Sequence, residues 1–258
     1  AVEPLLQSEK YLTQNPTNDG GTDAGRFEKG NDLSLWAKAS GLVGYWKFDE
    51  GSGSSASDSS GNQLTGVLEN DGGFAPPSWV AGGKMGNALM FVYDSGAPSS
   101  NYVLVVNASA LNIPSTQPHT IEAWIYPQLP PAPNVSIVSK GSGSQGYGFA
   151  FAGLTNMGKI LFGHNNTFTN KTLSRTVFQS GRWYHLVGVY REVNVGEIYV
   201  NGSSDNIATA VINTDSLSDL YIGVQGAGRS FDGIMDEVKI YNRALSAAEI
   251  QAIYTATK

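Results

Sequence analysis

One stretch near the C-terminus indicates the fold class, and it reads Phe231-Asp-Gly-Ile-Met-Asp-Glu-Val-Lys-Ile-Tyr-Asn-Arg-Ala-Leu-Ser246. Within it, residues 234–240 are typical of a β-strand, in which successive side chains point to opposite faces. After it, Ser246 and Glu249 form the S-x-x-E pattern of a helix capping box, and Ile250 begins an apolar side. The chain is therefore predicted to end with a strand and a short helix.

The strand pattern repeats many times before this stretch. Runs rich in Val, Ile, Tyr and Phe are separated by Gly, Ser, Asn and Asp, and they lie at 43–48, 88–92, 102–106, 120–126, 135–139, 147–151, 159–163, 183–190, 197–200 and 220–224. Asn201-Gly202 is typical of a two-residue hairpin turn, since both residues tolerate positive φ. Many short strands without intervening helices predict an all-β sandwich or barrel with a short C-terminal helix.

Residues 1–40 differ from the rest of the chain. Leu5 and Leu6 lie on the apolar side of a short helical pattern, but Pro16 and the Gly20-Gly21 pair end that pattern. We therefore interpret residues 1–40 as an N-terminal tail, stalk or linker, and residues 41–258 as one β domain.

Composition excludes several function classes. The 258 residues contain 22 acidic and 16 basic side chains without a basic cluster, which argues against nucleic-acid binding because phosphate contacts need a basic face. No apolar run approaches the ~20 residues of a membrane span. The absence of cysteine excludes a disulfide framework and thiol catalysis. Thirty-one glycines, 12 tyrosines and 15% charged residues are typical of a turn-rich β protein found outside cells.

Blocks of sequence in a fixed order carry a resemblance that extends over 41–254. They are Gly41-Leu-Val-Gly-Tyr-Trp-Lys-Phe-Asp-Glu-Gly-Ser-Gly53, Gly83-Lys-Met-Gly-Asn-Ala-Leu-Met-Phe91, Thr120-Ile-Glu-Ala-Trp-Ile-Tyr-Pro127, Arg182-Trp-Tyr-His-Leu-Val-Gly-Val-Tyr190, Ile198-Tyr-Val-Asn-Gly202 and 231–246. They resemble the laminin-G-like (LamG-like) jelly-roll domains of the concanavalin A-like lectin/glucanase superfamily, which occur in many bacterial surface proteins. The resemblance implies a two-sheet antiparallel β-sandwich. The loops at 92–101 and 127–133 depart from the family pattern, and loops carry specificity.

Asp236 is the first candidate metal ligand. Strict alternation places it on one face with Ile234 and Val238, so we expect its side chain to point into an apolar layer. A carboxylate is costly to bury unless it is paired or bound to a metal.

The resemblance implies that the first and last strands lie side by side, and that a calcium ion is often bound there. This arrangement brings Asp49 and Glu50 near Asp236, with Glu50 as the inward partner by alternation, while Asp58 and Asn62 follow in a serine-rich loop. Since Ca²⁺ prefers six to eight oxygen ligands, we predict a structural calcium site from Asp49, Glu50, Asp58, Asn62 and Asp236. In the alternative, Asp236 accepts from backbone amides, and Asp58 and Asn62 are turn formers.

Aromatic side chains in or beside loops are the candidate ligand-binding residues, because a sugar ring stacks on an aromatic ring. Of these we take as candidates Trp79, Tyr93, Tyr147 and Phe168, while Tyr102 and Phe178 lie in similar positions. Trp46, Trp124 and Trp183 fall inside strand motifs and are predicted core residues, as is His185.

Catalytic patterns are not found in the sequence. The glycanases of the superfamily present Glu-x-Asp-x-x-Glu on one strand, and this string is missing, as are a G-x-S-x-G elbow and a P-loop. Gly141-Ser-Gly-Ser-Gln-Gly146 reads G-x-G-x-x-G, but the next run, 147–151, is typical of a strand rather than a helix, which favours a hairpin.

These observations predict a non-catalytic, extracellular or cell-surface binding module of bacterial type, with a structural Ca²⁺. The resemblance implies a carbohydrate ligand, such as a cell-surface or matrix glycan, on the concave sheet or at loop tips, as in an adhesin. One alternative is a structural or pilin-like assembly subunit that contacts other protein subunits through residues 1–40. Another is a divergent glycanase or polysaccharide lyase.

Overall fold

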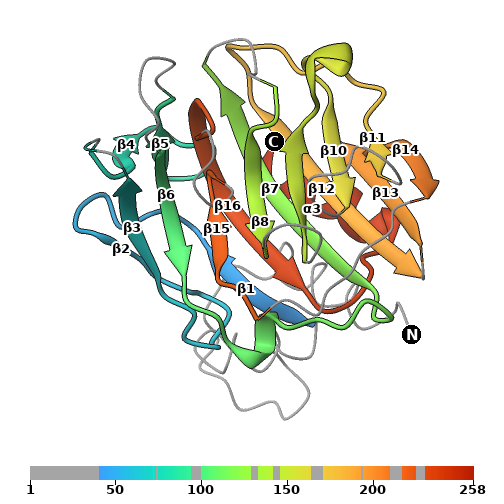
Figure 1. Ribbon diagram of the computed structural model, residues 1–258, viewed down its shortest axis with the longest axis horizontal. Coiled ribbons are helices and arrows are strands. Elements are labelled where there is room, and N and C mark those ends of the chain that lie inside the picture. The colour runs from blue at the N-terminus through green and yellow to red at the C-terminus, as the bar shows by residue number, and fades with distance from the viewer. Residues whose placement is uncertain are drawn as a thin grey trace, which may run out of the picture.

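The structure is a computed structural model that describes residues 41–71, 73, 75–93, 100–128, 133–141, 146–163, 171–192, 194–209, 217–224 and 230–258. This part of the chain forms two antiparallel sheets packed face to face and one C-terminal α-helix (Figure 1). The all-β sandwich with a short terminal helix is therefore confirmed. The predicted tail, residues 1–40, lies outside the described residues.

The first sheet is built from strands of both ends of the chain. Its members are β1 (Leu42–Trp46), β4 (Ser78–Ala81), β5 (Asn87–Phe91), β7 (His119–Pro127), β12 (Tyr184–Glu192), β13 (Val195–Val200), β14 (Ser203–Thr209) and β16 (Gly233–Tyr241). They follow the order β14-β13-β12-β7-β16-β5-β4, and β1 also pairs with β16. The first and last strands therefore lie side by side, as expected.

The second sheet contains the remaining strands. These are β2 (Ser55–Ala56), β3 (Gly66–Asp71), β6 (Ser100–Val105), β8 (Ser136–Lys140), β9 (Tyr147–Phe151), β10 (Ile160–Gly163), β11 (Thr172–Leu173) and β15 (Leu220–Ile222). Their order is β11-β10-β9-β8-β15-β6-β3-β2. Two short 3₁₀ turns, η1 (Ser109–Leu111) and η2 (Leu154–Asn156), lie in the connections.

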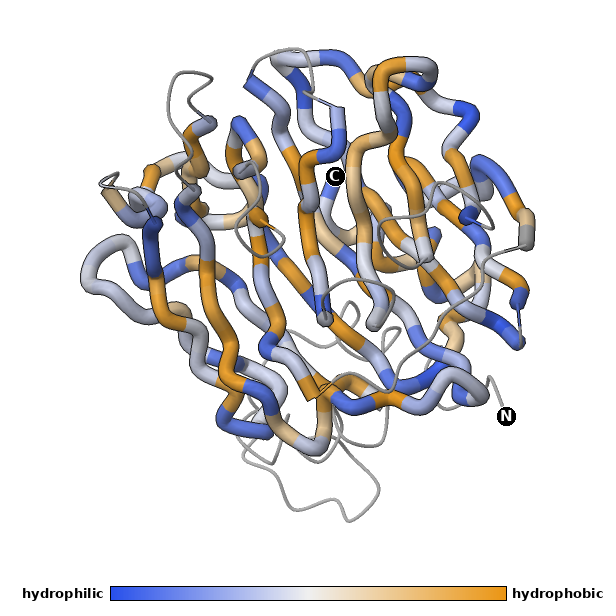
Figure 2. The backbone as a smooth tube through the Cα atoms, in the orientation of Figure 1, coloured by the Kyte–Doolittle hydropathy of each residue, from blue (hydrophilic) through white to orange (hydrophobic). Residues whose placement is uncertain are grey.

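The core fills the space between the two sheets. Figure 2 shows hydrophobic residues alternating with hydrophilic ones along many strands, so that each strand gives one side to this space. The sheets approach closely at Gly188, where a Cβ atom would lie only 2.4 Å from the ring of Phe162. A larger residue at position 188 would therefore push the sheets apart.

The predicted hairpin turn and the strand after the glycine-rich loop are both confirmed. Asn201 and Gly202 have φ values of 51° and 78° and connect β13 to β14. Gly146 leads into β9, which pairs antiparallel with β8. The G-x-G-x-x-G string therefore leads to a strand, and not to the helix that a dinucleotide site requires.

Strand β16 contains a bulge that changes the direction of its acidic side chains. Met235 and Val238 both belong to the core, so the two residues between them leave the strict alternation. The pairing with β7 shifts between Asp236 and Lys239, and Glu237 has a φ of 56°. Asp236 pairs with Trp124, on the face away from the core. The expectation that Asp236 points into the apolar layer is therefore wrong, because the extra residue places both acids on the outer face.

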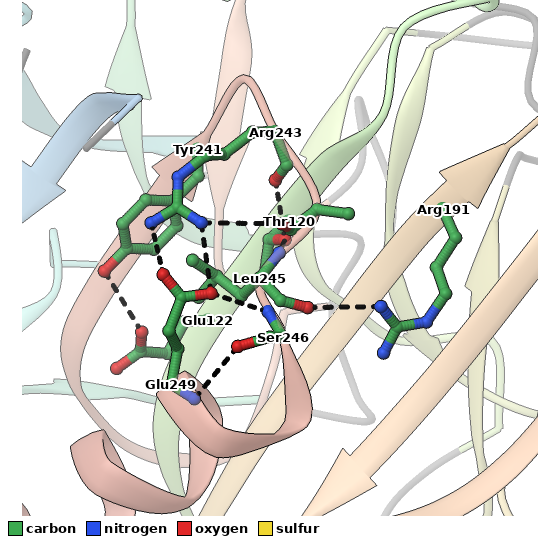
Figure 3. A network of polar contacts seen from close by, with 9 residues as sticks. Thr120, Glu122, Arg191, Tyr241, Arg243, Leu245, Ser246 and Glu249 are labelled. Atoms are coloured by element: carbon green, nitrogen blue, oxygen red, sulfur yellow. Dashed lines mark hydrogen bonds and ion pairs between the residues drawn. The ribbon is translucent and has the colours of Figure 1, made fainter. Parts of the chain in front are cut away.

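The helix α3 (Ala247–Thr257) covers part of this outer face. Its capping box is confirmed, since the side chain of Ser246 accepts from the Glu249 N–H, and Glu249 accepts from the Ser246 N–H. Arg243 forms an ion pair with Glu249 at 2.8 Å, and Figure 3 shows how these contacts hold the helix start against the sheet. The Tyr254 ring stacks on Trp124, with the ring centres 5.9 Å apart.

Candidate functional site

Two acidic side chains converge on the loop that connects β4 to β5. Oδ2 of Asp236 accepts a hydrogen bond from the Met85 N–H at 2.8 Å, and Oδ1 of Asp49 accepts from the Asn87 N–H at 3.1 Å. Gly86 has a φ of 75°, and a Cβ atom there would lie 2.1 Å from Asp49 Oδ1. Glycine at this position therefore lets the loop turn and leaves room for the carboxylate.

The Asp236 carboxylate is buried and only partly hydrogen-bonded. Its side chain is fully buried, and Oδ1 has no hydrogen-bond partner among the described residues. Burial raises the pKa of Asp236 to about 7, and the charges of Glu237 and Asp49 act in the same direction, whereas the N–H groups of Met85 and Glu237 oppose them. A cation beside Oδ1 would offset this cost of burial.

The other three predicted metal ligands lie elsewhere. Glu50 is exposed and accepts from the Ser57 N–H, so the expectation that it points inward is wrong. The physical reason is that β1 ends at Trp46 and Phe48 has a φ of 59°, which breaks the alternation before Glu50. The structure therefore does not bring Glu50 to Asp236.

Asp58 and Asn62 are turn formers in this structure. The carboxylate of Asp58 accepts from the N–H groups of Tyr45, Ser60 and Leu64 and from the Ser60 hydroxyl. Asn62 donates to the Val43 carbonyl oxygen at 2.7 Å. Both side chains therefore fix their own loop against β1, which is the alternative interpretation of these two residues.

The pair Asp49 and Asp236 fits a calcium ion in part. The free Oδ1 atom of Asp236 and the nearby Asp49 carboxylate supply hard oxygen ligands, and backbone carbonyls and water commonly complete such a site. Within the described ranges, however, no three histidine or acidic side chains form a metal-binding group. Of the five predicted ligands, the structure thus brings only Asp49 and Asp236 to the same loop.

A buried network of charged groups also lies on the outer face of the first sheet. Lys239 Nζ is 2.9 Å from Glu122 Oε1 and 3.2 Å from Glu237 Oε2, and the Tyr45 hydroxyl donates to Glu237. Burial alone would raise the pKa of Glu122, but the Lys239 ammonium and His185 lower it to about 2. His185 is fully buried, as predicted, with Nε2 3.3 Å from Glu122 Oε1. These groups are closed to solvent, which supports a structural role.

A pocket lies on the outer face of the second sheet. Since Phe149 and Tyr147 point to the core, Gly148 and Ala150 point outward, and residues paired with them share that face. The pocket is shallow and partly open to solvent, and its lining is mainly small or apolar: Ser136, Val138, Ser139, Tyr147, Gly148, Phe149, Ala150, Leu161, Gly163 and Lys171. Burial lowers the pKa of Lys171 to about 8.

Two tyrosines stand beside this pocket. Tyr221 pairs across the strands with Ser139, and its ring lies 5.5 Å from the ring of Tyr102. Both rings are partly exposed. Burial and the Asp71 carboxylate raise the pKa of Tyr102 to about 12, so its hydroxyl stays protonated at physiological pH. The rings of Tyr221 and Tyr102 thus form an aromatic wall next to the pocket floor. The floor consists of small residues and carries hydroxyl groups and one amine.

The aromatic residues predicted from sequence to bind a ligand lie in different environments. Tyr147 is 2% exposed and donates to the Leu111 carbonyl oxygen, so its ring belongs to the core, although the residue is also part of the pocket lining. Trp79 lies on edge strand β4 and donates to the Gly53 carbonyl oxygen at 2.7 Å. Tyr93 is partly exposed just after β5, whereas Phe168 lies outside the described residues.

The pocket could be found from sequence only in part. Tyr102 was recognisable as an aromatic residue beside a loop, but Tyr221, Ser139 and Gly148 carried no distinctive pattern. They come together through the pairing of β15, β8 and β9, which are far apart along the chain. Small residues signal a pocket floor only when their larger neighbours are known.

The sequence matches a known protein family that has this fold. The sequence profile of a laminin-G-like family, described as concanavalin A-like lectin/glucanases superfamily, matches residues 95–251. The chain belongs to this superfamily. No curated protein matches the chain at a significant level of sequence similarity. The match and the two-sheet architecture agree with the predicted LamG-like jelly roll.

Several solved structures share this fold. Domain 4 of an extracellular arabinanase from Geobacillus stearothermophilus, in complex with arabinotriose, is 18% identical with a TM-score of 0.62, over 83% of this chain and 98% of that chain. The binding domain of Paraclostridial Mosquitocidal Protein 1 is 16% identical with a TM-score of 0.62, over 84% and 52%. That of Botulinum Neurotoxin DC in complex with SialylT is 10% identical with a TM-score of 0.61, over 84% and 52%. The chain spans about half the length of the two toxin domains, and these identities establish the fold alone.

Proposed function

We propose that this LamG-like domain is a non-catalytic, carbohydrate-binding module, and that its ligand lies on the outer face of the second sheet. The observation that carries the proposal is the pocket floor of Ser139 and Gly148 beside the partly exposed rings of Tyr221 and Tyr102. A sugar presents an apolar ring face and polar hydroxyls, so it matches an aromatic wall joined to small polar groups.

The chemistry of the pocket favours binding over hydrolysis. A retaining glycanase needs two carboxyl groups about 5 to 5.5 Å apart, and an inverting enzyme needs them somewhat farther apart. The described lining of the pocket holds one amine, from Lys171, and hydroxyls, but no acidic or histidine side chain. These groups can orient hydroxyls or an acidic substituent of a glycan.

The structural neighbours support the same class of ligand. The arabinanase domain was solved with arabinotriose and a neurotoxin binding domain with SialylT. An adhesive module at a bacterial cell surface or in the extracellular medium would meet such glycans. None of the helices in the described part of the chain is long and apolar enough to cross a membrane.

A structural calcium ion is the second element of the proposal. Asp236 and Asp49 would hold it at the loop between β4 and β5, where it would neutralise two neighbouring carboxylates. The ion would stabilise the fold, because this site lies on the outer face of the first sheet while the proposed glycan site lies on the second.

Co-sedimentation of the full chain with a panel of insoluble polysaccharides, in calcium buffer and with chelator, tests the proposal. The same samples are assayed for reducing ends and for unsaturated sugars. Binding without release of either product is expected. Release of reducing ends or unsaturated sugars would instead identify a glycanase or a lyase, and a lack of binding to every polysaccharide would count against the carbohydrate site.

A further inference from the structure

A buried lysine at the end of β8 contacts an asparagine that follows β6, another strand of the same sheet. Lys140 Nζ donates to Asn107 Oδ1 at 3.0 Å and also to the carbonyl oxygen of Ser218. Lys140 is only 1% exposed. Its amine is therefore held against one carboxamide and away from bulk water.

The strand order explains why these residues meet. Asn107 follows β6, Ser218 precedes β15, and Lys140 ends β8, and the three strands are neighbours in the order β8-β15-β6. Leu220 pairs with Val105 on one side and with Lys140 on the other. Side chains from three segments therefore meet where these three neighbouring strands begin or end, on the same side of the second sheet's strand ends.

A carboxylate completes the group. Asp219 Oδ1 accepts a hydrogen bond from the Asn107 backbone N–H at 2.7 Å, and its negative charge acts on the Lys140 ammonium. Burial nevertheless lowers the pKa of Lys140 to about 8. A lowered pKa increases the share of the neutral amine, and a neutral amine is a nucleophile.

We propose that Lys140 and Asn107 form an intramolecular isopeptide bond. The neutral Nζ atom attacks Cγ of Asn107, a new C–N bond forms, and the bond from Cγ to Nδ2 breaks. The proton lost by Nζ is transferred to Nδ2, which leaves as ammonia. One amine and one carboxamide thus yield one secondary amide and one ammonia molecule, without an oxidant or a reductant.

The fold holds the two reacting groups next to each other before the reaction. An amine that is already hydrogen-bonded to its target carbonyl loses little further freedom in reaching the reactive arrangement. The product joins β6 to β8 across β15 and spans 33 residues of sequence. It constrains the unfolded chain as a disulfide does, in a sequence that contains no cysteine. This inference does not depend on the proposed glycan site.

The test is the intact mass of the full chain, measured under denaturing conditions. The expected mass is that of the sequence minus one ammonia molecule. A glutamate-specific protease then cuts at Glu122, between the two partners, and the fragments 70–122 and 123–192 are expected to remain covalently joined. A full-length mass equal to that of the unmodified sequence would overturn the proposal.

Variants separate this bond from other losses of ammonia. Lys140→Arg keeps the positive charge and is expected to show the full mass, whereas a succinimide at Asn107 would still lose ammonia in this variant. Asn107→Asp is expected to lose water in place of ammonia. Lys171→Arg, which alters a half-buried lysine just before β11, is expected to stay linked. Loss of ammonia that persists in Lys140→Arg would contradict the assignment even if the wild-type mass agrees.

Discussion

Asp236 and Met85 lie 151 residues apart in sequence, and the carboxylate of the first accepts a 2.8 Å hydrogen bond from the backbone N–H of the second. Only Oδ2 takes part, while the buried Oδ1 has no partner in the described part of the chain. Because an ionised buried carboxylate is costly, this side chain is expected to bind either a proton or a cation.

Removal of this charge should abolish a response to calcium. We predict that millimolar calcium raises the Tm of the wild-type chain and that Asp236→Asn removes this increase, because the variant lacks one of the two carboxylates at the loop between β4 and β5. Differential scanning calorimetry with calcium and with chelator measures both values. Identical wild-type melting curves with and without chelator would contradict the calcium site.

Asp58→Ala provides the matched control for that experiment. This variant loses hydrogen bonds to the N–H groups of Tyr45, Ser60 and Leu64, and we expect it to lower the free energy of unfolding by about 2 kcal/mol. The increase of Tm with calcium should remain, since Asp58 lies in its own loop. Loss of the calcium response in this variant would restore Asp58 to the metal site.

Acid should destabilise the fold through His119. Its ring is fully buried between Tyr147 and Tyr190, and burial lowers its pKa from 6.5 to about 4 although the Gln117 carbonyl oxygen opposes this. Between these values the unfolded chain binds more protons than the folded one. The contribution of His119 to stability therefore falls by about 3 kcal/mol in total as the pH drops from about 6.5 to about 4, while the raised pKa of Asp236 acts in the opposite direction over the same interval.

Urea unfolding at several pH values, for the wild type and for His119→Phe, measures this effect. The variant cannot take up the proton, so the free energy of unfolding of the wild type should fall relative to that of the variant as the pH drops over that interval. If both proteins lose stability in parallel, another group is responsible for the acid sensitivity.

Truncation of the aromatic wall should weaken glycan binding. We expect Tyr221→Ala to reduce affinity roughly tenfold, which corresponds to about 1.4 kcal/mol, because the sugar loses its stacking surface. Tyr93→Ala, a partly exposed tyrosine after β5, serves as the control and should leave affinity unchanged. Isothermal titration with a glycan retained by the chain provides the numbers, and the reverse order of effects would move the site away from the second sheet.

The helix cap makes a separate prediction. Ser246→Ala removes the acceptor for the Glu249 N–H and is expected to lower the free energy of unfolding by about 1 kcal/mol. Ser246→Asp retains an acceptor and should preserve most of the stability. Equal losses in the two variants, measured by urea unfolding, would show that the cap does not explain the effect.

The fold could be predicted because its signals are local. Alternating polarity, the Asn201-Gly202 turn and the capping box at Ser246 each depend on a few neighbouring residues, and the structure contains all three. The bulge at Glu237 could not be predicted this way, because an extra residue in one strand is visible only in its pairing with another. One unpaired residue was enough to reverse the expected direction of Asp236.

The candidate sites were harder to predict than the fold. The pairing of β1 with β16 was expected, and it does bring Asp49 towards Asp236, but the local backbone after Trp46 turns Glu50 to the surface. The pocket beside Tyr221 depends on strands that are distant in sequence. Such long-range contacts leave no pattern in a single chain.

The most direct test of the central claim is a glycan array probed side by side with the wild-type chain and Tyr221→Ala, in calcium buffer. The account predicts that the wild type retains at least one class of glycan and that the variant loses signal at those same glycans. A blank array for the wild type, or equal retention by both proteins, would contradict a carbohydrate site on the second sheet.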